Sequence, residues 1–152
     1  MLRISKMADY ATLIMSYLAR IYPAQASARD IALHTHIARP TVSKLLKLLS
    51  MEALLHSVRG VQGGYTLHCD PKEISLAQIV YALDSSRGLT VCHHQPESCA
   101  LQSVCTVQGN WKLISRAIET ALDSITLDAL AKPVLEPQDL SAMQASLEKI
   151  YS

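Results

Sequence analysis

Residues 40–67 decide the fold, and they read PTVSKLLKLLSMEALLHSVRGVQGGYTL. The first ten of them predict a helix, because Pro40 suits a first helical position and apolar residues then recur at helical spacing. Residues 54–59 and 65–67 predict two strands, and the glycine-rich residues between them predict the turn that joins these strands. A helix followed directly by a β-hairpin is therefore the first structural expectation.

The residues before this stretch predict two further helices. Apolar spacing indicates a helix over residues 5–22. Ser27 and Asp30 fit a capping box at the start of a short helix, and residues 34–37 predict the turn that follows it. The apolar side of the short helix is expected to consist of Ile31, Ala32 and Leu33.

Two helices joined by a turn and followed by a hairpin are typical of a winged helix-turn-helix. We therefore expect a mainly α fold with a long C-terminal dimerisation helix. Its residues 1–70 would form a DNA-binding winged helix-turn-helix of three helices plus a two-stranded wing.

The helix over residues 40–49 turns its polar side chains outward, and these suit DNA. Lysine ammonium groups neutralise phosphates, and short hydroxyl side chains let a helix sink into a major groove. Arg59 lies at the edge of the hairpin, where it is placed to enter a minor groove. The candidate DNA-contacting residues are Arg39, Thr41, Ser43, Lys44, Lys47, Arg59, Gly63 and Tyr65. The alternatives are a solvated basic helix face and a hairpin that only covers the core.

The net charge of +1 hides a segregation of charge along the 152 residues. Residues 1–68 hold eight Lys or Arg and three Asp or Glu, whereas residues 69–152 hold six and ten. A basic first half and an acidic second half are typical of a nucleic-acid-binding domain joined to a part that does not touch nucleic acid. Chance clustering on a solvated surface is the other interpretation.

Composition excludes several classes of protein. With 49% hydrophobic and 18% charged residues, the chain can bury a core and is not expected to be disordered. No apolar run approaches the ~20 residues of a membrane helix, and no apolar signal-peptide stretch follows the N-terminus. We expect a cytoplasmic protein without membrane association, whose four cysteines are reduced thiols or metal ligands rather than disulfides.

The second half of the chain predicts a cysteine-containing segment followed by a long helix. Residues 71–132 include a capped helix, lose helical periodicity over residues 84–109, and resume it from Asn110.

The apolar stripe of the long helix needs a partner, and a symmetric copy of the chain is the commonest one. Packing against the first helix is the alternative. The predicted dimerisation residues are Trp111, Ile114, Ile118, Leu122 and Ile125. Residues 133–152 predict a linker and a C-terminal helix.

Three cysteines, Cys92, Cys99 and Cys105, lie in the aperiodic segment with six and five residues between them. Zinc ribbons prefer cysteines about two to four residues apart, whereas an iron–sulfur cluster tolerates longer spacing. Iron–sulfur ligation, zinc binding and ordinary thiols all remain open from the spacing. Cys69 lies outside this segment and is interpreted as a packed or half-exposed thiol.

Together these residues resemble the Rrf-type family of bacterial winged-helix transcription regulators, which includes iron–sulfur and redox sensors. The resemblance covers residues 1–132. The opening, the Thr-Val-Ser-Lys stretch and the Asn-Trp pair look most like regulators of the Suf iron–sulfur assembly operon. The matching motifs are Leu2–Lys6 with Asp9–Ala11, Thr41–Leu46, Ser57–Tyr65, the three cysteines and Asn110–Trp111.

The resemblance implies a homodimer that binds double-stranded operator DNA and whose long helices cross between subunits. It also implies an iron–sulfur cluster, [2Fe–2S] or [4Fe–4S], on the three cysteines of each subunit. Isc-type regulators carry a histidine ligand three residues after the last cysteine, where this chain has Gln108. The nitric-oxide-sensing branch instead uses an N-terminal aspartate from the partner subunit, a position that Asp9 matches. Asp9 is thus the expected fourth ligand, with Gln108 and His93 as alternatives.

The function expected from the sequence is a DNA-binding transcription regulator, not an enzyme. It would sense iron–sulfur cluster status or redox state and control genes of cluster assembly. The alternative is a winged-helix regulator that uses the cysteines as a thiol or zinc switch without a cluster. The absence of a Cys-x-x-Cys motif disfavours a thiol oxidoreductase. A winged helix that binds only protein is a further alternative. Replacing Lys44, Lys47 and Arg59 would abolish the retention of DNA by a DNA-binding protein but would have no effect on a protein-binding one.

Overall fold

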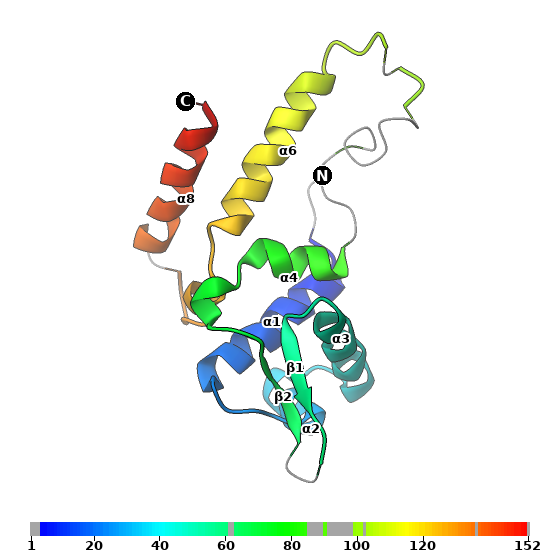
Figure 1. Ribbon diagram of the computed structural model, residues 1–152, viewed down its shortest axis with the longest axis vertical. Helices are drawn as coiled ribbons and strands as arrows, with labels where there is room; N and C mark the ends of the chain where they lie inside the picture. Colours follow the sequence, from blue (N-terminus) through cyan, green and yellow to red (C-terminus); the bar gives the residue numbers. More distant parts are fainter. Residues whose placement is uncertain are drawn as a thin grey trace.

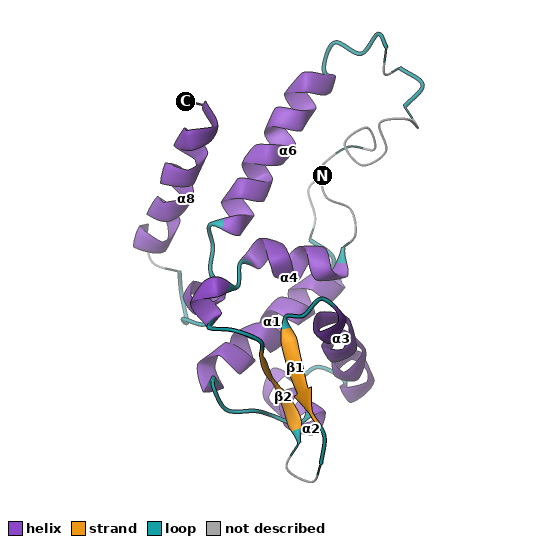
Figure 2. Cartoon of the chain, viewed as in Figure 1, coloured by secondary structure: helices purple, strands orange, loops and turns teal. Residues whose placement is uncertain are grey.

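Three helices and a hairpin form one end of the molecule, as Figure 1 shows. The computed structural model describes residues 4–60, 63–84, 90, 99–101, 103–135 and 137–151. The predicted order of three helices and a two-stranded hairpin is confirmed (Figure 2). These elements are α1 (Lys6–Ile21), α2 (Ala28–Thr35), α3 (Arg39–Met51), β1 (Leu55–Val58) and β2 (Gly64–Leu67).

Side-chain caps start the first two helices. The Ser5 hydroxyl accepts a hydrogen bond from the Ala8 N–H at 3.1 Å. Before α2, the Asp30 N–H donates to the Ser27 hydroxyl at 3.2 Å, and the Ser27 N–H donates back to the Asp30 carboxylate at 3.4 Å. The Ser27 hydroxyl also donates to that carboxylate, which lowers the pKa of Asp30. The predicted capping box is confirmed.

The turn between α2 and α3 is shorter than predicted, because α2 continues through Thr35. The Thr35 hydroxyl donates to the Ile31 carbonyl at 2.7 Å, and His36 takes the left-handed conformation that ends the helix. The expectation that Leu33 lies on the apolar side of α2 is wrong, since its side chain is 64% exposed. Leu33 lies about 200° round the helix from the buried Ile31, whereas Thr35 lies nearly on the same side as Ile31.

The hairpin pairs its strands in antiparallel register, with Leu55 opposite Leu67. Its turn contains Gly60 at a φ of +121°, a conformation that side chains disfavour. A Cβ on Gly63 would collide with the Val58 carbonyl oxygen, so only glycine fits there. The predicted glycine-rich turn is confirmed at these two positions.

The loop before α2 adds a rung to the hairpin that the sequence did not predict. The Ala26 N–H donates to the Tyr65 carbonyl at 3.0 Å, and the Tyr65 N–H donates to the Ala26 carbonyl at 2.8 Å. A Cβ on Gly64 would lie 2.7 Å from the Ala26 carbonyl oxygen, so the missing side chain permits this approach. The pairing ties the hairpin to the start of the helix-turn-helix.

Helices dominate the second half of the described chain. α6 and α8 extend from the winged body and contact each other along their length (Figure 1). α8 confirms the predicted C-terminal helix, and none of the described helices is long and apolar enough to cross a membrane. The elements are η1 (Pro71–Glu73), α4 (Leu76–Leu83), α6 (Gln108–Asp123), α7 (Leu127–Leu130) and α8 (Pro137–Tyr151).

The hydrophobic core lies between α1, α3 and the hairpin, and residues of the second half complete it. Ile74, Ile79 and Leu127 are at most 1% exposed and belong to the same cluster as the buried leucines of α3. α1 contacts both α4 and α7. The division after residue 70 stays a prediction, but the core crosses that position.

The long helix differs from its predicted bounds at both ends. α6 begins two residues before the expected cap at Asn110, and it ends at Asp123. Ile125 was expected on this helix but lies beyond its end, so that placement is wrong. The Ile125 carbonyl accepts a hydrogen bond from the Leu76 N–H at 2.8 Å, and the Thr126 hydroxyl caps α7. These two interactions hold the backbone after Asp123 in a non-helical conformation, so α6 ends there.

Candidate nucleic-acid interface

α3 separates an inner apolar face from an outer polar face. Four side chains face inward and are fully buried in the core: Val42, Leu45, Leu46 and Leu49. Five side chains lie on the outer face, all exposed except the half-buried threonine: Arg39, Thr41, Ser43, Lys44 and Lys47. Because α3 contains no acidic residue, its outer face is positively charged. The buried face therefore fixes the predicted polar set in the outward orientation.

The hairpin brings a further cation to this end of the molecule. Arg59 is exposed and directly follows β1, at the end of the hairpin that projects away from the body (Figure 2). β1 packs against α3, so the hairpin and the basic helix form one unit. Such a unit can engage phosphates with α3 while Arg59 reaches an adjoining groove.

Gly63 and Tyr65, two of the candidate DNA-contacting residues, have structural roles in the hairpin. Gly63 has no room for a side chain, as described above. The Tyr65 side chain is half-buried and packs against the core, while its backbone pairs with Ala26. Both residues set the position of Arg59 through the hairpin's shape.

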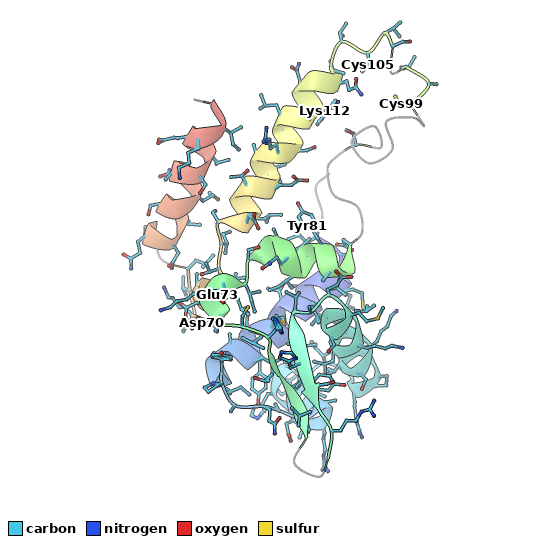
Figure 3. The ribbon with its side chains drawn as sticks, in the orientation of Figure 1. Asp70, Glu73, Tyr81, Cys99, Cys105 and Lys112 are labelled. Atoms are coloured by element: carbon cyan, nitrogen blue, oxygen red, sulfur yellow. The ribbon has the colours of Figure 1, made fainter. Side chains whose placement is uncertain are left out.

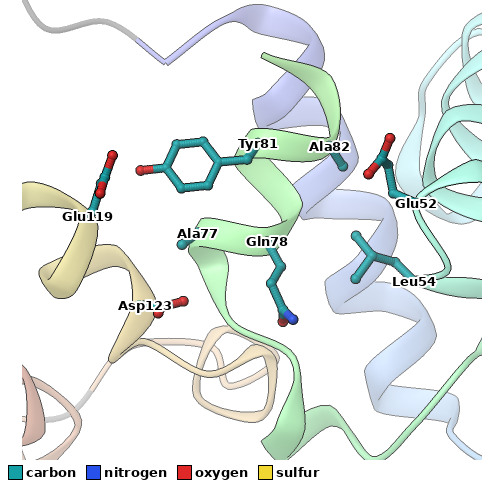
Figure 4. A pocket seen from close by; sticks show the side chains of 8 residues that line it. All are labelled: Glu52, Leu54, Ala77, Gln78, Tyr81, Ala82, Glu119 and Asp123. Carbon is teal, nitrogen blue, oxygen red and sulfur yellow. The ribbon is translucent and has the colours of Figure 1, made fainter. Parts of the chain in front are cut away.

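An acidic cleft lies on the opposite, α6-facing side of the winged body (Figure 4). Figure 4 shows Tyr81 of α4 directed toward α6, with carboxylates on either side of the cleft. One of these, Asp123, accepts a hydrogen bond from the Ser75 hydroxyl at 2.7 Å. Phosphate is repelled by such a lining, so this cleft is not a candidate phosphate-binding surface. The lining residues are Glu52, Leu54, Ala77, Gln78, Tyr81, Ala82, Glu119 and Asp123.

The cysteine site is described only in part. Cys92 and His93 lie outside the described residues, whereas Cys99 and Cys105 are half-buried free thiols. Figure 3 shows these two thiols beyond the N-terminal end of α6, at the end of the molecule opposite the hairpin. Gln108 is the first residue of α6, three residues after Cys105. Within the described ranges, no three His, Cys, Asp or Glu side chains are grouped closely enough to hold a metal ion.

Asp9, the expected fourth ligand, is exposed in the first turn of α1. α1 belongs to the winged body, and Figure 3 places Cys99 and Cys105 well away from that body. A single chain therefore does not bring Asp9 to these cysteines. The separation is compatible with donation of Asp9 by a second subunit.

The N-terminal half of α6 exposes an apolar face. Trp111 is 39% exposed and Ile114 is 44% exposed, while Ile118 and Leu122 further along the helix are half-buried. The segment before the helix adds exposed apolar side chains, namely Leu101, Val104 and Val107. α8 and α4 contact α6 but leave this face in solvent. A patch of this kind marks an interaction surface.

A family model described as an iron-dependent transcriptional regulator, Rrf2, matches residues 4–133. This chain belongs to the Rrf2 family. The predicted family resemblance is thereby confirmed, while the finer likeness to Suf-operon regulators stays a prediction. The Rrf2 family and the relatives named below are transcriptional regulators, not enzymes.

Curated relatives of this Rrf2 chain include the HTH-type transcriptional regulator IscR of two organisms. The protein from Aliivibrio salmonicida is 34% identical over 101 residues, which cover 66% of this chain and 60% of that protein. The protein from Vibrio atlanticus is 32% identical over 112 residues, which cover 72% of this chain and 64% of that protein. The chain therefore spans less than two thirds of the length of these IscR relatives.

Solved structures confirm the mainly α, winged-helix fold of this Rrf2 chain. CymR, the global cysteine regulator of B. subtilis, aligns with a TM-score of 0.69 at 28% identity, over 86% of this chain and 97% of that one. T. potens IscR aligns with a TM-score of 0.66 at 29% identity, over 85% of this chain and 86% of that one. The same fold thus occurs in a cysteine regulator and in an IscR.

Proposed function

We propose that this chain is a DNA-binding transcription regulator that senses iron–sulfur cluster status or redox state and controls genes of cluster assembly. The observation that carries the proposal is the combination, in one Rrf2 chain, of a basic α3–hairpin unit with a cysteine segment that leads directly into α6. The family's description as iron-dependent favours a cluster over a purely thiol-based signal.

The DNA contacts follow from the outer face of α3. Thr41 and Ser43 approach base edges in a major groove, while Arg39, Lys44 and Lys47 bind phosphates or guanine edges. Arg59 enters the neighbouring minor groove, where the potential is most negative. Gly63 and Tyr65 support this contact by fixing the hairpin.

The functional unit is a homodimer joined through α6. Trp111 and Ile114 are the central contacts, because they are large, apolar and exposed in the single chain. Ile118 and Leu122 extend the interface along the helix. A two-fold dimer places two α3 helices on one face of the DNA, so that they read two half-sites about one helical turn apart.

The residues of the cysteine segment fit an iron–sulfur cluster. Cys99 and Cys105 are half-buried thiols, and Cys105 lies just before the N-terminus of α6. Three thiolates, with Cys92 as the third, form the soft donor set that iron–sulfur clusters use. A bound cluster makes the protein sensitive to iron and oxidants, because the cysteines are ligated while the cluster is present and free once it is lost. Asp9 of the second subunit is the proposed fourth ligand, with Gln108 and His93 as alternatives.

The same segment supplies the route from signal to DNA. Cys105 and the start of α6 are separated by only Thr106 and Val107, so ligation of Cys105 restricts how α6 begins. In the dimer, α6 sets the separation of the two α3 helices. The protein then has two arrangements that bind operator DNA differently, and ligation of the cysteines selects between them.

Absorption spectroscopy of the protein purified without oxygen tests the sensing part of this proposal. We expect broad visible bands from iron–thiolate charge transfer, and we expect Cys99→Ser to remove them. Cys69→Ser is the matched control, because Cys69 packs beside the winged core and is not a proposed ligand. A wild-type protein that stays colourless after reconstitution with iron and sulfide would leave the thiol or zinc switch as the function.

A further inference from the structure

Two histidines meet at the base of the hairpin, outside every site described above. His56 lies in β1 opposite Thr66, and His68 follows β2 two residues after Thr66. Residues two apart on a strand share a face, so both histidines lie on the outer face of the hairpin as diagonal neighbours. The backbone N–H of His68 also donates to the Leu54 carbonyl at 3.1 Å, which extends the backbone hydrogen bonds of the hairpin to this position. The backbone therefore holds both residues in place.

The two imidazole rings touch through their nitrogens. Nδ1 of His68 lies 2.7 Å from Nε2 of His56, with the ring centroids 4.4 Å apart and the ring planes tilted by 50°. A divalent ion about 2.0–2.1 Å from each nitrogen would set them about 2.9 Å apart at a right angle, or about 3.3 Å at a tetrahedral angle. The two nitrogens must move apart by a few tenths of an ångström, and both side chains are exposed and free to make that movement. The proton that lies between the two nitrogens is transferred, by a change of tautomer, to the other ring nitrogen of its histidine, so that both facing nitrogens offer lone pairs to the ion.

We propose that His56 and His68 form a binding site for a divalent transition-metal ion such as Zn²⁺, Ni²⁺ or Cu²⁺. Neutral imidazole is a favoured ligand for all three ions. Because the described residues hold no group of three or more metal-binding side chains, the protein supplies two ligands here and water completes the coordination. The site is separate from the cysteine segment, which lies at the opposite end of the molecule from the hairpin (Figure 3).

The position of the pair gives the ion a structural consequence. His56 lies near the start of β1 and His68 lies just past β2, so a bound ion links the two strands at the end opposite the Arg59 turn. An ion that binds only the paired strands stabilises the hairpin by mass action. Metal binding therefore restricts the hairpin that carries Arg59.

The test is a zinc titration of the full-length reduced protein, followed through the ring nitrogens of each histidine by NMR. We expect the His56 and His68 signals to shift together and to saturate. His56→Gln should raise the Zn²⁺ concentration needed to shift His68 by at least about tenfold, because a chelating pair loses its second ligand. His68→Gln should have the same effect on His56. Zinc taken up by the cysteine segment does not confuse this readout, since each ring is observed separately.

His36→Asn is the matched control. His36 is an exposed histidine at the end of α2 with a φ of +56°, a conformation that asparagine tolerates. This variant should leave the zinc response of His56 and His68 unchanged. The proposal is overturned if His68 responds at the same Zn²⁺ concentration in the His56→Gln protein. It is equally overturned if the pair responds no earlier than His36, since the two rings would then be only hydrogen-bonded.

Discussion

Replacing Lys44, Lys47 and Arg59 together by alanine is expected to abolish DNA binding at physiological salt. All three side chains are exposed, and none contributes to the core, so the fold should survive the change. Each phosphate contact adds about 0.9 to the slope of log K against log salt, so the residual slope should fall by about 2 to 3 units. Fluorescence anisotropy with a mixed-sequence duplex at several salt concentrations measures both quantities.

The matched control removes the same charge from the acidic half of the chain. Lys72, Lys112 and Lys149 are exposed and lie outside the α3–hairpin unit, so their replacement by alanine should leave the salt slope nearly unchanged. Equal slopes for wild type and the Lys44/Lys47/Arg59 variant would contradict the proposed interface. They would favour a winged helix whose partner is another protein.

Ile114→Asp is expected to convert the proposed homodimer into a monomer. Ile114 is 44% exposed in the single chain, so an aspartate there is tolerated in the monomer but is buried unpaired in the dimer. Light scattering after size exclusion reports the mass. The DNA for this test is a duplex selected with the wild-type protein from a random library. A dimer gains affinity by binding two half-sites at once, so the monomer should bind this duplex about 100-fold or more weakly.

Leu33→Asp serves as the control for that change. Leu33 is 64% exposed on α2, and the same substitution there should preserve both the dimer and the fold. Trp111→Ala provides a second, milder variant on the proposed interface. A dimeric Ile114→Asp protein with unchanged DNA affinity would show that α6 does not join the subunits.

The winged helix-turn-helix could be predicted because its signals are local. The capping box at Ser27, the proline at position 40 and the glycines at 60 and 63 each determine the backbone within a few residues. Local chemistry of this kind appears directly in the sequence. The outward orientation of Lys44 and Lys47 follows equally directly from the apolar spacing of α3.

Features that depend on tertiary contacts could not be predicted. The pairing of Ala26 with Tyr65 joins segments nearly forty residues apart, and only the absence of a side chain at Gly64 hints at it. Ile125 continues the helical spacing of α6 in sequence, yet its carbonyl pairs with Leu76 and the helix has already ended. At Ile125 a long-range backbone hydrogen bond overrides the local pattern, whereas at Ala26 and Tyr65 it adds a pairing for which the sequence has no local pattern.

The candidate sites also differ in whether local sequence or tertiary contacts define them. The sequence identified the cysteine segment from residue type and spacing, but in the single chain Asp9 belongs to the winged body, and Cys99 and Cys105 lie away from that body (Figure 3). Ligation by Asp9 therefore depends on the proposed second subunit. The histidine pair was missed, because His56 and His68 are twelve residues apart and meet only through the hairpin register. Register is set by the turn and the buried face, not by the histidines themselves.

The most direct test of the proposed cluster-controlled DNA binding is the Kd of the wild-type protein for the selected duplex, measured with the cluster bound and after its removal. Both measurements are made at the same salt concentration, because phosphate contacts dominate the absolute affinity. If ligation of the cysteines selects between two arrangements of α6, the two Kd values should differ by about 5- to 150-fold. Identical Kd values in the two states would contradict cluster control of DNA binding.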